Sequence, residues 1–256
     1  MSKIKLSNTI IKQIDKIVDF YKGEQHIFDS LANSVLINLF ESEELKNNIH
    51  FTKIRSKDPE HLRDKLERIA RQAIKVGEGF VITPDNVFVE IDDLAGVRLL
   101  HLHTKQMVKI HPLIIDMLKE HSYISTCKPI AYTWDDEYSQ FFESIGIEVS
   151  SKDSMYTSVH YIVKPKRLTE MRCEIQVRTL VEEVWGEVSH KINYPHKTES
   201  LSCQEQLRVL ARATSTCTRL VDSIFVTYHE YEKRVKKSKK TKKKVKKKKK
   251  KTKKKS

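Results

Sequence analysis

The chain has 256 residues and carries 48 Lys and Arg against 34 Asp and Glu, a net charge of +14. Residues 233–256 hold 18 of the basic residues and no acidic one, so residues 1–232 carry a net charge of −4. No apolar run reaches the ~18 residues of a membrane-spanning helix, and the four cysteines form no CxxC pair, so we expect no transmembrane helix and reduced thiols in place of a disulfide framework. We expect a cytoplasmic globular domain with a basic tail.

Two amphipathic helices are predicted at the N-terminus. Apolar residues recur at helical spacing from about Asn8 to Tyr21, where Gly23 predicts the end of the helix, and again over residues 28–40. We expect these helices, within residues 1–48, to cover the domain that follows or to pair with a partner.

Basic residues stand at the junction of the next predicted strand and helix. Residues 49–55 alternate as a strand, and the Asp-Pro pair at 58–59 is a strong helix start. Arg55 and Lys57 therefore lie where a strand meets a helix N-terminus, which favours anions, and Lys65 follows two turns along the helix. Ordinary surface ion pairs are the alternative.

Two adjacent acids, Asp92 and Asp93, precede Gly96 and a buried strand. The run 97–102 is almost wholly apolar, as in an inner strand. A carboxylate held by a rigid element is a good metal ligand, although one of the two acids can be a simple turn residue.

A later strand, predicted over residues 155–163, carries Tyr156 and His160 on one face. The phenol ring can stack on a base and the imidazole can donate to a phosphate. A core tyrosine and a satisfied histidine would give the same pattern.

The strand predicted over residues 171–178 places Glu174, Gln176 and Arg178 on one face and apolar residues on the other. At Thr179 the period becomes helical, so the strand runs straight into a helix. This face could bind a metal, act as a base or hold phosphate, or be a solvated strand face with a cross-strand ion pair.

The C-terminal part contains a long helix over residues 201–232 and a lysine-rich segment. Like-charge repulsion and the near absence of apolar residues predict that residues 233–256 are disordered. There is no Walker or Rossmann glycine pattern, and with only six glycines a glycine-cradled nucleotide site is not expected.

Four motifs in order resemble the synthetase domain of the RelA/SpoT family, the enzymes that make (p)ppGpp in the stringent response. They are Arg55-x-Lys57 with Lys65, Asp93-x-x-Gly96-x-Arg98, Tyr156-x-Ser158-x-His160-Tyr161, and Glu174-Ile175-Gln176-Val177-Arg178-Thr179 with Trp185 and His190. The resemblance runs from about Phe51 to His196 and suggests a stand-alone synthetase domain over residues 49–200.

The resemblance implies an α/β fold related to nucleotidyltransferases, with a mixed five-stranded sheet flanked by helices. It implies a GTP diphosphokinase that transfers the β,γ-diphosphate of ATP to the ribose 3′-hydroxyl of GTP or GDP with Mg²⁺. The implied roles are ATP binding by Arg55, Lys57 and Lys65, metal binding by Asp93 and Glu174, proton abstraction by Glu174, acceptor binding by Lys152, Tyr156 and His160, and support by Arg98, Gln176 and Arg178.

The chain departs from the family pattern beside the acceptor motif. Ser154 and Met155 stand where the family commonly has Asn and Gly, and His61 stands where Ser is usual. The acceptor is therefore left open, and the alternatives are a toxin-type pyrophosphokinase acting on the 3′ end of tRNA and a non-catalytic nucleotide- or RNA-binding relative. RNA or another polyanion is a candidate partner of the lysine-rich tail, and homo-oligomerisation is left open.

Overall fold

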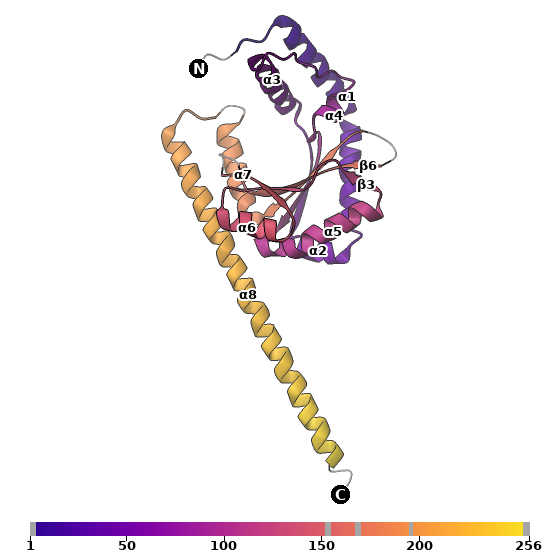
Figure 1. The fold of residues 1–256 in the computed structure, drawn as a ribbon, viewed down its shortest axis with the longest axis vertical. Coiled ribbons are helices and arrows are strands. Elements are labelled where there is room, and N and C mark those ends of the chain that lie inside the picture. Colours follow the sequence, from indigo (N-terminus) through magenta and orange to yellow (C-terminus); the bar gives the residue numbers. More distant parts are fainter. Residues whose placement is uncertain (1–3, 152–154, 167–169, 195–196, 253–256) are drawn as a thin grey trace.

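The computed structural model describes residues 4–151, 155–166, 170–194 and 197–252, without the side chains of 238 and 240–252. A mixed sheet forms the centre of the molecule, and helices flank it (Figure 1). Its strands are β1 Phe51–Ser56, β2 Ala95–His101, β3 Tyr123–Ser125, β4 Ile130–Tyr132, β5 Glu148–Ser150, β6 Ser158–Pro165 and β7 Cys173–Thr179. A mixed sheet flanked by helices, as expected, is thus confirmed.

The strand order is β1-β2-β7-β6-β4-β5, with β3 paired to β6. β2 and β7 are parallel, as are β4 and β5, and the other pairs are antiparallel. The expected number of five strands is wrong, because the described residues form a sheet of seven strands. The segment 123–132 is divided into β3 and β4, since Pro129 lacks the N–H that a continuous ladder needs, and the short β5 adds an edge strand.

The helices are α1 Asn8–Leu39, α2 Glu43–Asn48, α3 Pro59–Lys75, α4 Val87–Glu90, α5 Met107–Glu120, α6 Asp136–Ser144, α7 Leu180–Asn193 and α8 Leu201–Thr252, with a 3₁₀ turn at Thr104–Gln106. The helix break expected at Gly23 is wrong, because α1 runs through it. A glycine inside a helix costs only about 1 kcal/mol, and the buried stripe continues on both sides of it with Tyr21 and Phe28.

The two faces of the sheet have different roles. Ile54, Val97, Ile175 and Tyr161 lie opposite one another across four strands and belong to the hydrophobic core, which α1 and α5 complete. On the other face α7 contacts β2 and β7, and α8 packs on α7. One face is therefore structural, and the other is left for polar side chains.

Helix α8 extends far beyond the rest of the molecule (Figure 1). Asp222 is its last buried residue among those described: its carboxylate accepts from the His103 ring at 2.8 Å and from the Lys105 amide at 2.9 Å. The structure continues the helix to Thr252, through the segment expected from the sequence to be disordered. Lysine is a good helix former, so its propensity opposes the charge repulsion on which that expectation rested. No helix in the described part of the chain has the length and apolar character to cross a bilayer.

Candidate active site

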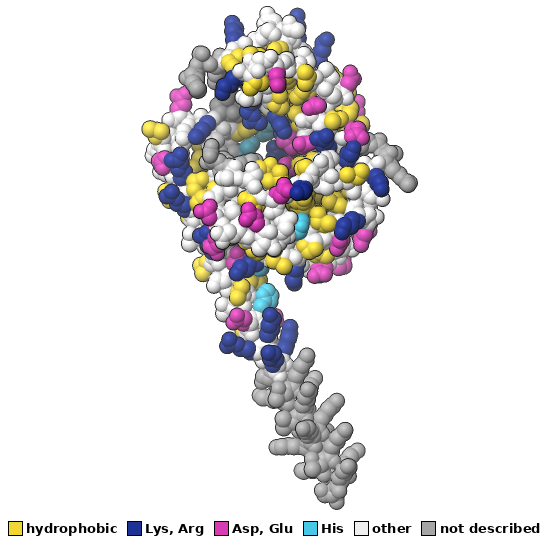
Figure 2. Space-filling view, viewed as in Figure 1, with side chains coloured by type: hydrophobic (Ala, Val, Ile, Leu, Met, Phe, Trp, Pro, Cys, Tyr) yellow, Lys and Arg dark blue, Asp and Glu magenta, His cyan; other side chains and the backbone are white. Residues whose placement is uncertain are grey.

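A cleft of about 870 Å³ lies between the polar face of the sheet and the helices α3 and α7. Figure 2 shows a hollow in this part of the surface, with basic, acidic and histidine side chains inside it. The lining includes Arg55, Lys65, Asp93, Arg98, Tyr156, His160, Glu174, Gln176 and Arg178. Motifs from four separate stretches of the sequence are therefore brought together in one cavity.

Strand register explains how the polar side chains meet. Lys53, Arg98, Gln176 and His160 lie directly opposite one another across β1, β2, β7 and β6. The neighbouring row on the same face contains Arg55, Gly96, Glu174 and Ile162. A Cβ on Gly96 would lie 3.3 Å from the Arg55 carbonyl oxygen and 3.6 Å from that of Glu174. Because glycine has no side chain, the space between the side chains of Arg55 and Glu174 stays open to the cleft.

Asp93 is held by two lysines at the start of β2. Lys57 Nζ lies 2.5 Å from Oδ2, and Lys65 Nζ lies 2.8 Å from Oδ1. Lys57 is buried behind the cleft wall, with its amide bound to the Leu94 carbonyl at 3.0 Å and its own carbonyl accepting from the Tyr21 hydroxyl at 2.7 Å. Burial opposes ionisation of Asp93, but Lys57 and Lys65 outweigh it and hold its pKa far below the usual range.

Glu174 is held by His160 and Gln176. His160 Nδ1 lies 2.7 Å from Oε1, and Gln176 Nε2 donates to Oε2 at 2.6 Å. The other ring nitrogen of His160 lies 3.0 Å from the Tyr156 hydroxyl. Burial raises the pKa of Glu174, but the hydrogen bonds from His160 and Gln176 and the charge of His160 together outweigh burial. The net shift of the pKa is downward, so the group is a carboxylate at neutral pH.

Two arginines of the cleft are paired with acids on α7. Arg98 Nη1 lies 2.6 Å from Glu183 and 2.8 Å from Glu187, and Arg178 pairs with the other oxygen of Glu183. The Arg178 guanidinium also lies over the Tyr156 ring, 5.7 Å from its centroid. Sequence reasoning missed both glutamates, although their spacing of four residues places them on one face of the helix.

Three aromatic side chains line the end of the cleft between α3 and α7. His61 lies edge-on to Tyr194 at 4.2 Å and to His190 at 5.2 Å between ring centroids, and the rings of His190 and Tyr194 stack at 4.6 Å. The Tyr194 hydroxyl donates to the His61 carbonyl at 3.1 Å. The sequence pointed to His190 only as part of a motif, and no motif or pattern in the sequence pointed to Tyr194 as a site residue.

The carboxylates of Asp93 and Glu174 fit a hard divalent cation. Both line the cleft, and the charge of Asp93 acts to raise the pKa of Glu174, a repulsion that a bound cation would relieve. Mg²⁺ usually takes one or two protein carboxylates and completes its shell with water and phosphate oxygens. Among the described residues no cluster of three or more His, Cys, Asp or Glu could hold a metal, so this pair would supply only part of the coordination.

Most site residues expected from the sequence lie in this cleft, with three qualifications. Lys57 is behind the wall and reaches the site through Asp93. The two ring nitrogens of His160 contact Glu174 and Tyr156, and its contact with the acceptor's phosphates stays a prediction. Lys152 lies outside the described residues.

Two known groups of sequences are similar to this chain. A sequence model described as a region found in RelA / SpoT proteins matches residues 54–199. The GTP pyrophosphokinase YwaC of Bacillus subtilis strain 168 is 26% identical over 200 residues, which are 74% of this chain and 82% of that protein.

Two solved structures share the fold. Small alarmone synthetase 1 from Bacillus subtilis, bound to its product pppGpp, aligns with a TM-score of 0.54 at 18% identity, over 85% of this chain and 99% of that one. A GTP pyrophosphokinase family protein from Streptococcus pneumoniae aligns with a TM-score of 0.55 at 17% identity, over 88% of this chain and 97% of that one.

Proposed function

The chain belongs to the RelA/SpoT family, and from that premise we propose that it is a (p)ppGpp synthetase. The proposed reaction is transfer of the β,γ-diphosphate of ATP to the 3′-hydroxyl of GTP or GDP, as the resemblance to the family implies, and the similar protein YwaC is named a GTP pyrophosphokinase. The observation that carries the proposal is the pair of carboxylates, Asp93 and Glu174, on one wall of a cleft that also holds Arg55 and Lys65.

The donor phosphates are assigned to the side of the cleft formed by β1 and α3. Arg55 and Lys65 line this side, and their positive charges would neutralise the triphosphate and the charge that develops during transfer. Lys57 acts indirectly, since its ammonium is buried against Asp93 and fixes that carboxylate. Asp93 and Glu174 would hold Mg²⁺, which supplies charge neutralisation at the phosphate oxygens.

Glu174 is the proposed general base. The acceptor 3′-oxygen attacks the β-phosphorus, the bond from that phosphorus to the α–β bridging oxygen breaks, and AMP leaves, while the 3′-hydroxyl proton passes to Glu174. The lowered pKa keeps this side chain ionised and ready to accept a proton. His160 and Gln176 fix the orientation of the carboxylate through hydrogen bonds at 2.7 and 2.6 Å, so we assign them as positioning residues.

The acceptor base is assigned to Tyr156 at the other end of the cleft. Arg178 lies over the Tyr156 ring, and the ring lines the cleft, so a guanine can stack on it. The tyrosine hydroxyl is linked through His160 to Glu174, which couples the position of the base platform to that of the general base.

A single labelling experiment tests the function. The protein is incubated with Mg²⁺, γ-³²P-ATP and, separately, GTP, GDP, GMP or deacylated tRNA, with Glu174→Gln as the inactive control. We expect label on GTP and GDP in the wild type only. Label on tRNA alone would establish the toxin-type activity instead, and no label on any acceptor would leave a nucleotide-binding relative.

A further inference from the structure

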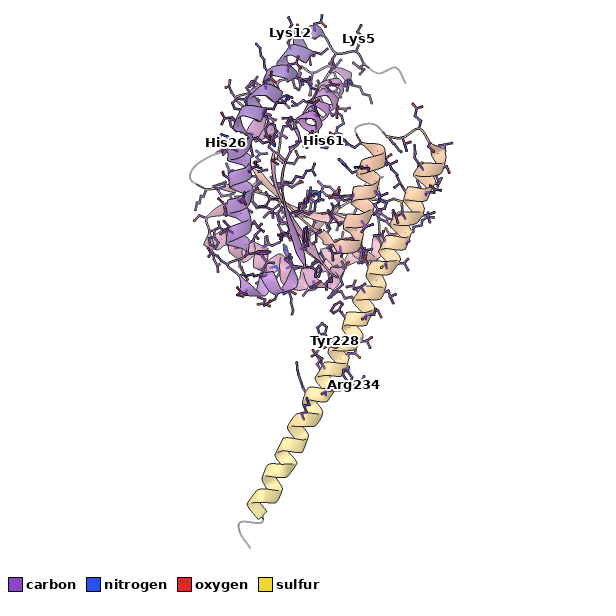
Figure 3. The ribbon with its side chains drawn as sticks, turned by 180° about the vertical axis from the view of Figure 1, so that it is seen from behind. Lys5, Lys12, His26, His61, Tyr228 and Arg234 are labelled. Atoms are coloured by element: carbon purple, nitrogen blue, oxygen red, sulfur yellow. The ribbon has the colours of Figure 1, made fainter. Side chains whose placement is uncertain are left out.

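We propose that Gly186 and Glu183 of α7 are positioning residues for Arg178. By holding the Arg178 guanidinium at the Tyr156 ring, they align the acceptor with the general base. This inference rests on the proposed function and deepens it, because it names how the acceptor platform is held in place. Figure 3 shows α7 between the strands and α8, with side chains filling the space between the helix and the sheet.

Gly186 leaves the space that the Arg178 guanidinium occupies. A Cβ at this position would lie 2.5 Å from Nη1, 3.2 Å from Cζ and 3.4 Å from Nη2 of Arg178. Gly186 lies in the middle of α7, where glycine is less favourable than alanine because it loses more backbone freedom. At this position the chain therefore has a residue that weakens the helix and makes room for a guanidinium.

The Arg178 guanidinium has little freedom to move away from α7. The side chain is only 3% exposed and forms an ion pair with Glu183. Its Cζ lies 5.7 Å from the centroid of the Tyr156 ring. Its Nε is buried without a hydrogen-bond partner among the described residues, so the ion pair and the packing at Gly186 set the position of the group. A methyl group at position 186 would push the guanidinium across the Tyr156 ring or out of its ion pair.

Arg178 belongs to a closed ring of side-chain contacts that contains the proposed general base. On one side of this ring, Arg178 contacts the Tyr156 ring. The Tyr156 hydroxyl lies 3.0 Å from His160 Nε2, and His160 Nδ1 lies 2.7 Å from Glu174 Oε1. The acceptor platform is thus connected to one oxygen of the general base.

On the other side of the ring, Glu183 bridges two arginines. One of its oxygens pairs with Arg178, and the other lies 2.6 Å from Arg98 Nη1. Arg98 Nε donates to Gln176 Oε1 at 3.3 Å, and Gln176 Nε2 donates to Glu174 Oε2 at 2.6 Å. The two routes from Arg178 therefore end on the two oxygens of Glu174, and α7 closes the ring through Glu183.

The ring explains how an uncharged glycine affects the reaction. A shift of Arg178 moves the Tyr156 ring, on which the acceptor base stacks, relative to Glu174, which takes the 3′-hydroxyl proton. Misplacement of reacting groups by about 1 Å can cost about 10²-fold in rate. The ring does not include Arg55 or Lys65, to which the donor phosphates are assigned. Substitution of Gly186 should therefore affect the acceptor and leave ATP binding unchanged.

Steady-state transfer from ATP to GDP by the full chain tests the role of Gly186. We expect Gly186→Ala to raise the KM of GDP by about tenfold, with the KM of ATP changed by less than about twofold. Gly23→Ala is the matched control, because Gly23 also lies inside a helix and a Cβ there meets nothing within 4 Å. Figure 3 shows His26, three residues further along α1, on the opposite side of the molecule from α7. The Tm of each variant shows that it is folded.

A double substitution separates the positioning of Arg178 from general damage to α7. Arg178→Lys replaces the wide guanidinium by a compact ammonium, which a methyl group at position 186 need not displace. We expect Gly186→Ala to change the KM of GDP by less than about twofold in the Arg178→Lys background, so the two effects are not additive. Glu183→Gln keeps the shape of the side chain and removes its charge, and it should reproduce the rise in the KM of GDP.

Four results would overturn the inference. They are an unchanged KM of GDP in Gly186→Ala, an unchanged KM of GDP in Glu183→Gln, equal rises for GDP and ATP in Gly186→Ala, and a full effect of Gly186→Ala in the Arg178→Lys background. Calorimetric titration with GDP is a readout that needs no catalysis, and Gly186→Ala should lose about tenfold in affinity there as well. A wild type that binds GDP but transfers nothing to it would overturn the proposed function alone. A wild type that binds neither GDP nor GTP would overturn both.

Discussion

Replacing Asp93 by Asn should reduce both activity and stability, and its neighbour Asp92 provides the control. The Asp93 carboxylate accepts hydrogen bonds from Lys57 and Lys65, and the Lys57 side chain is only 7% exposed. Asp93→Asn would leave the buried ammonium of Lys57 facing Lys65 without a counter-charge. Asp92 lies at the edge of the same cleft, is 44% exposed and pairs with Arg172 at 2.6 Å, so the same substitution there removes a partly exposed ion pair and leaves no buried charge without a partner.

The size of the effect follows from burial. Removing one partner of a buried pair typically costs about 3–5 kcal/mol. We expect about 3 kcal/mol for Asp93→Asn, because Lys65 is 26% exposed and an amide oxygen still accepts one hydrogen bond. In a chain of this size that lowers the Tm by about 6–12 °C. Asp92→Asn should cost at most about 1 kcal/mol.

Urea unfolding followed by tryptophan fluorescence measures these free energies, since Trp185 is buried beside α8 and its indole donates to the Leu207 carbonyl at 3.0 Å. The pKa of Asp93 is depressed in the folded state, so its contribution is fully present above the ordinary value of 3.8 and is lost as the pH falls through the folded value. The gap between wild type and Asp93→Asn should therefore shrink in acid. An Asp93→Asn variant as stable as Asp92→Asn at pH 7 would refute the reasoning.

Three further predictions concern catalysis and the tail. Tyr156→Ala should raise the KM of the acceptor by about tenfold or more with little change for ATP, because a base stack is lost; equal changes in both KM values would make Tyr156 a structural residue. Glu174→Gln should lower kcat at least ~10²-fold with an unchanged fold by circular dichroism, and a kcat within a few-fold of wild type would remove Glu174 from the mechanism. Truncation after Glu232 should leave transfer to GDP intact, since the last buried residue described in α8 is Asp222, and it should abolish retention on RNA at low salt. Loss of transfer would place the tail in the catalytic domain. Unchanged retention on RNA would refute the hypothesis that the tail binds polyanions.

Local patterns in the sequence placed β1 and β7 close to their observed ranges, whereas the strand predicted over residues 155–163 begins only at Ser158, so Tyr156 lies before β6. Alternation placed Glu174, Gln176 and Arg178 on one face, and the helix start at Asp58 is as predicted, with its side chain accepting from the amides of Glu60 and His61. The register between strands could not be read, although it is the register that sets Gly96 between Arg55 and Glu174.

Contacts between distant helices were beyond the reach of the sequence patterns. Glu183 and Glu187 look like ordinary exposed acids of an amphipathic helix until Arg98 is placed opposite them. The same holds for His61 and Tyr194, which are 133 residues apart and become neighbours only because α3 and α7 border one cleft. The continuity of α1 through Gly23 was likewise decided by packing on the sheet, which overrode a weak local stop signal.

The pairing of β2 with β7 has a consequence for when a newly made chain becomes active. The contacting side chains Arg98 and Gln176 are 78 residues apart, so the central strand pair closes a long loop and forms only after the second strand has been synthesised. Until then a nascent chain carries Asp93 without Glu174, and its cleft lacks the wall that β7 and α7 provide. Nascent chains that end before β7 would therefore be unable to consume nucleotides while they are still on the ribosome.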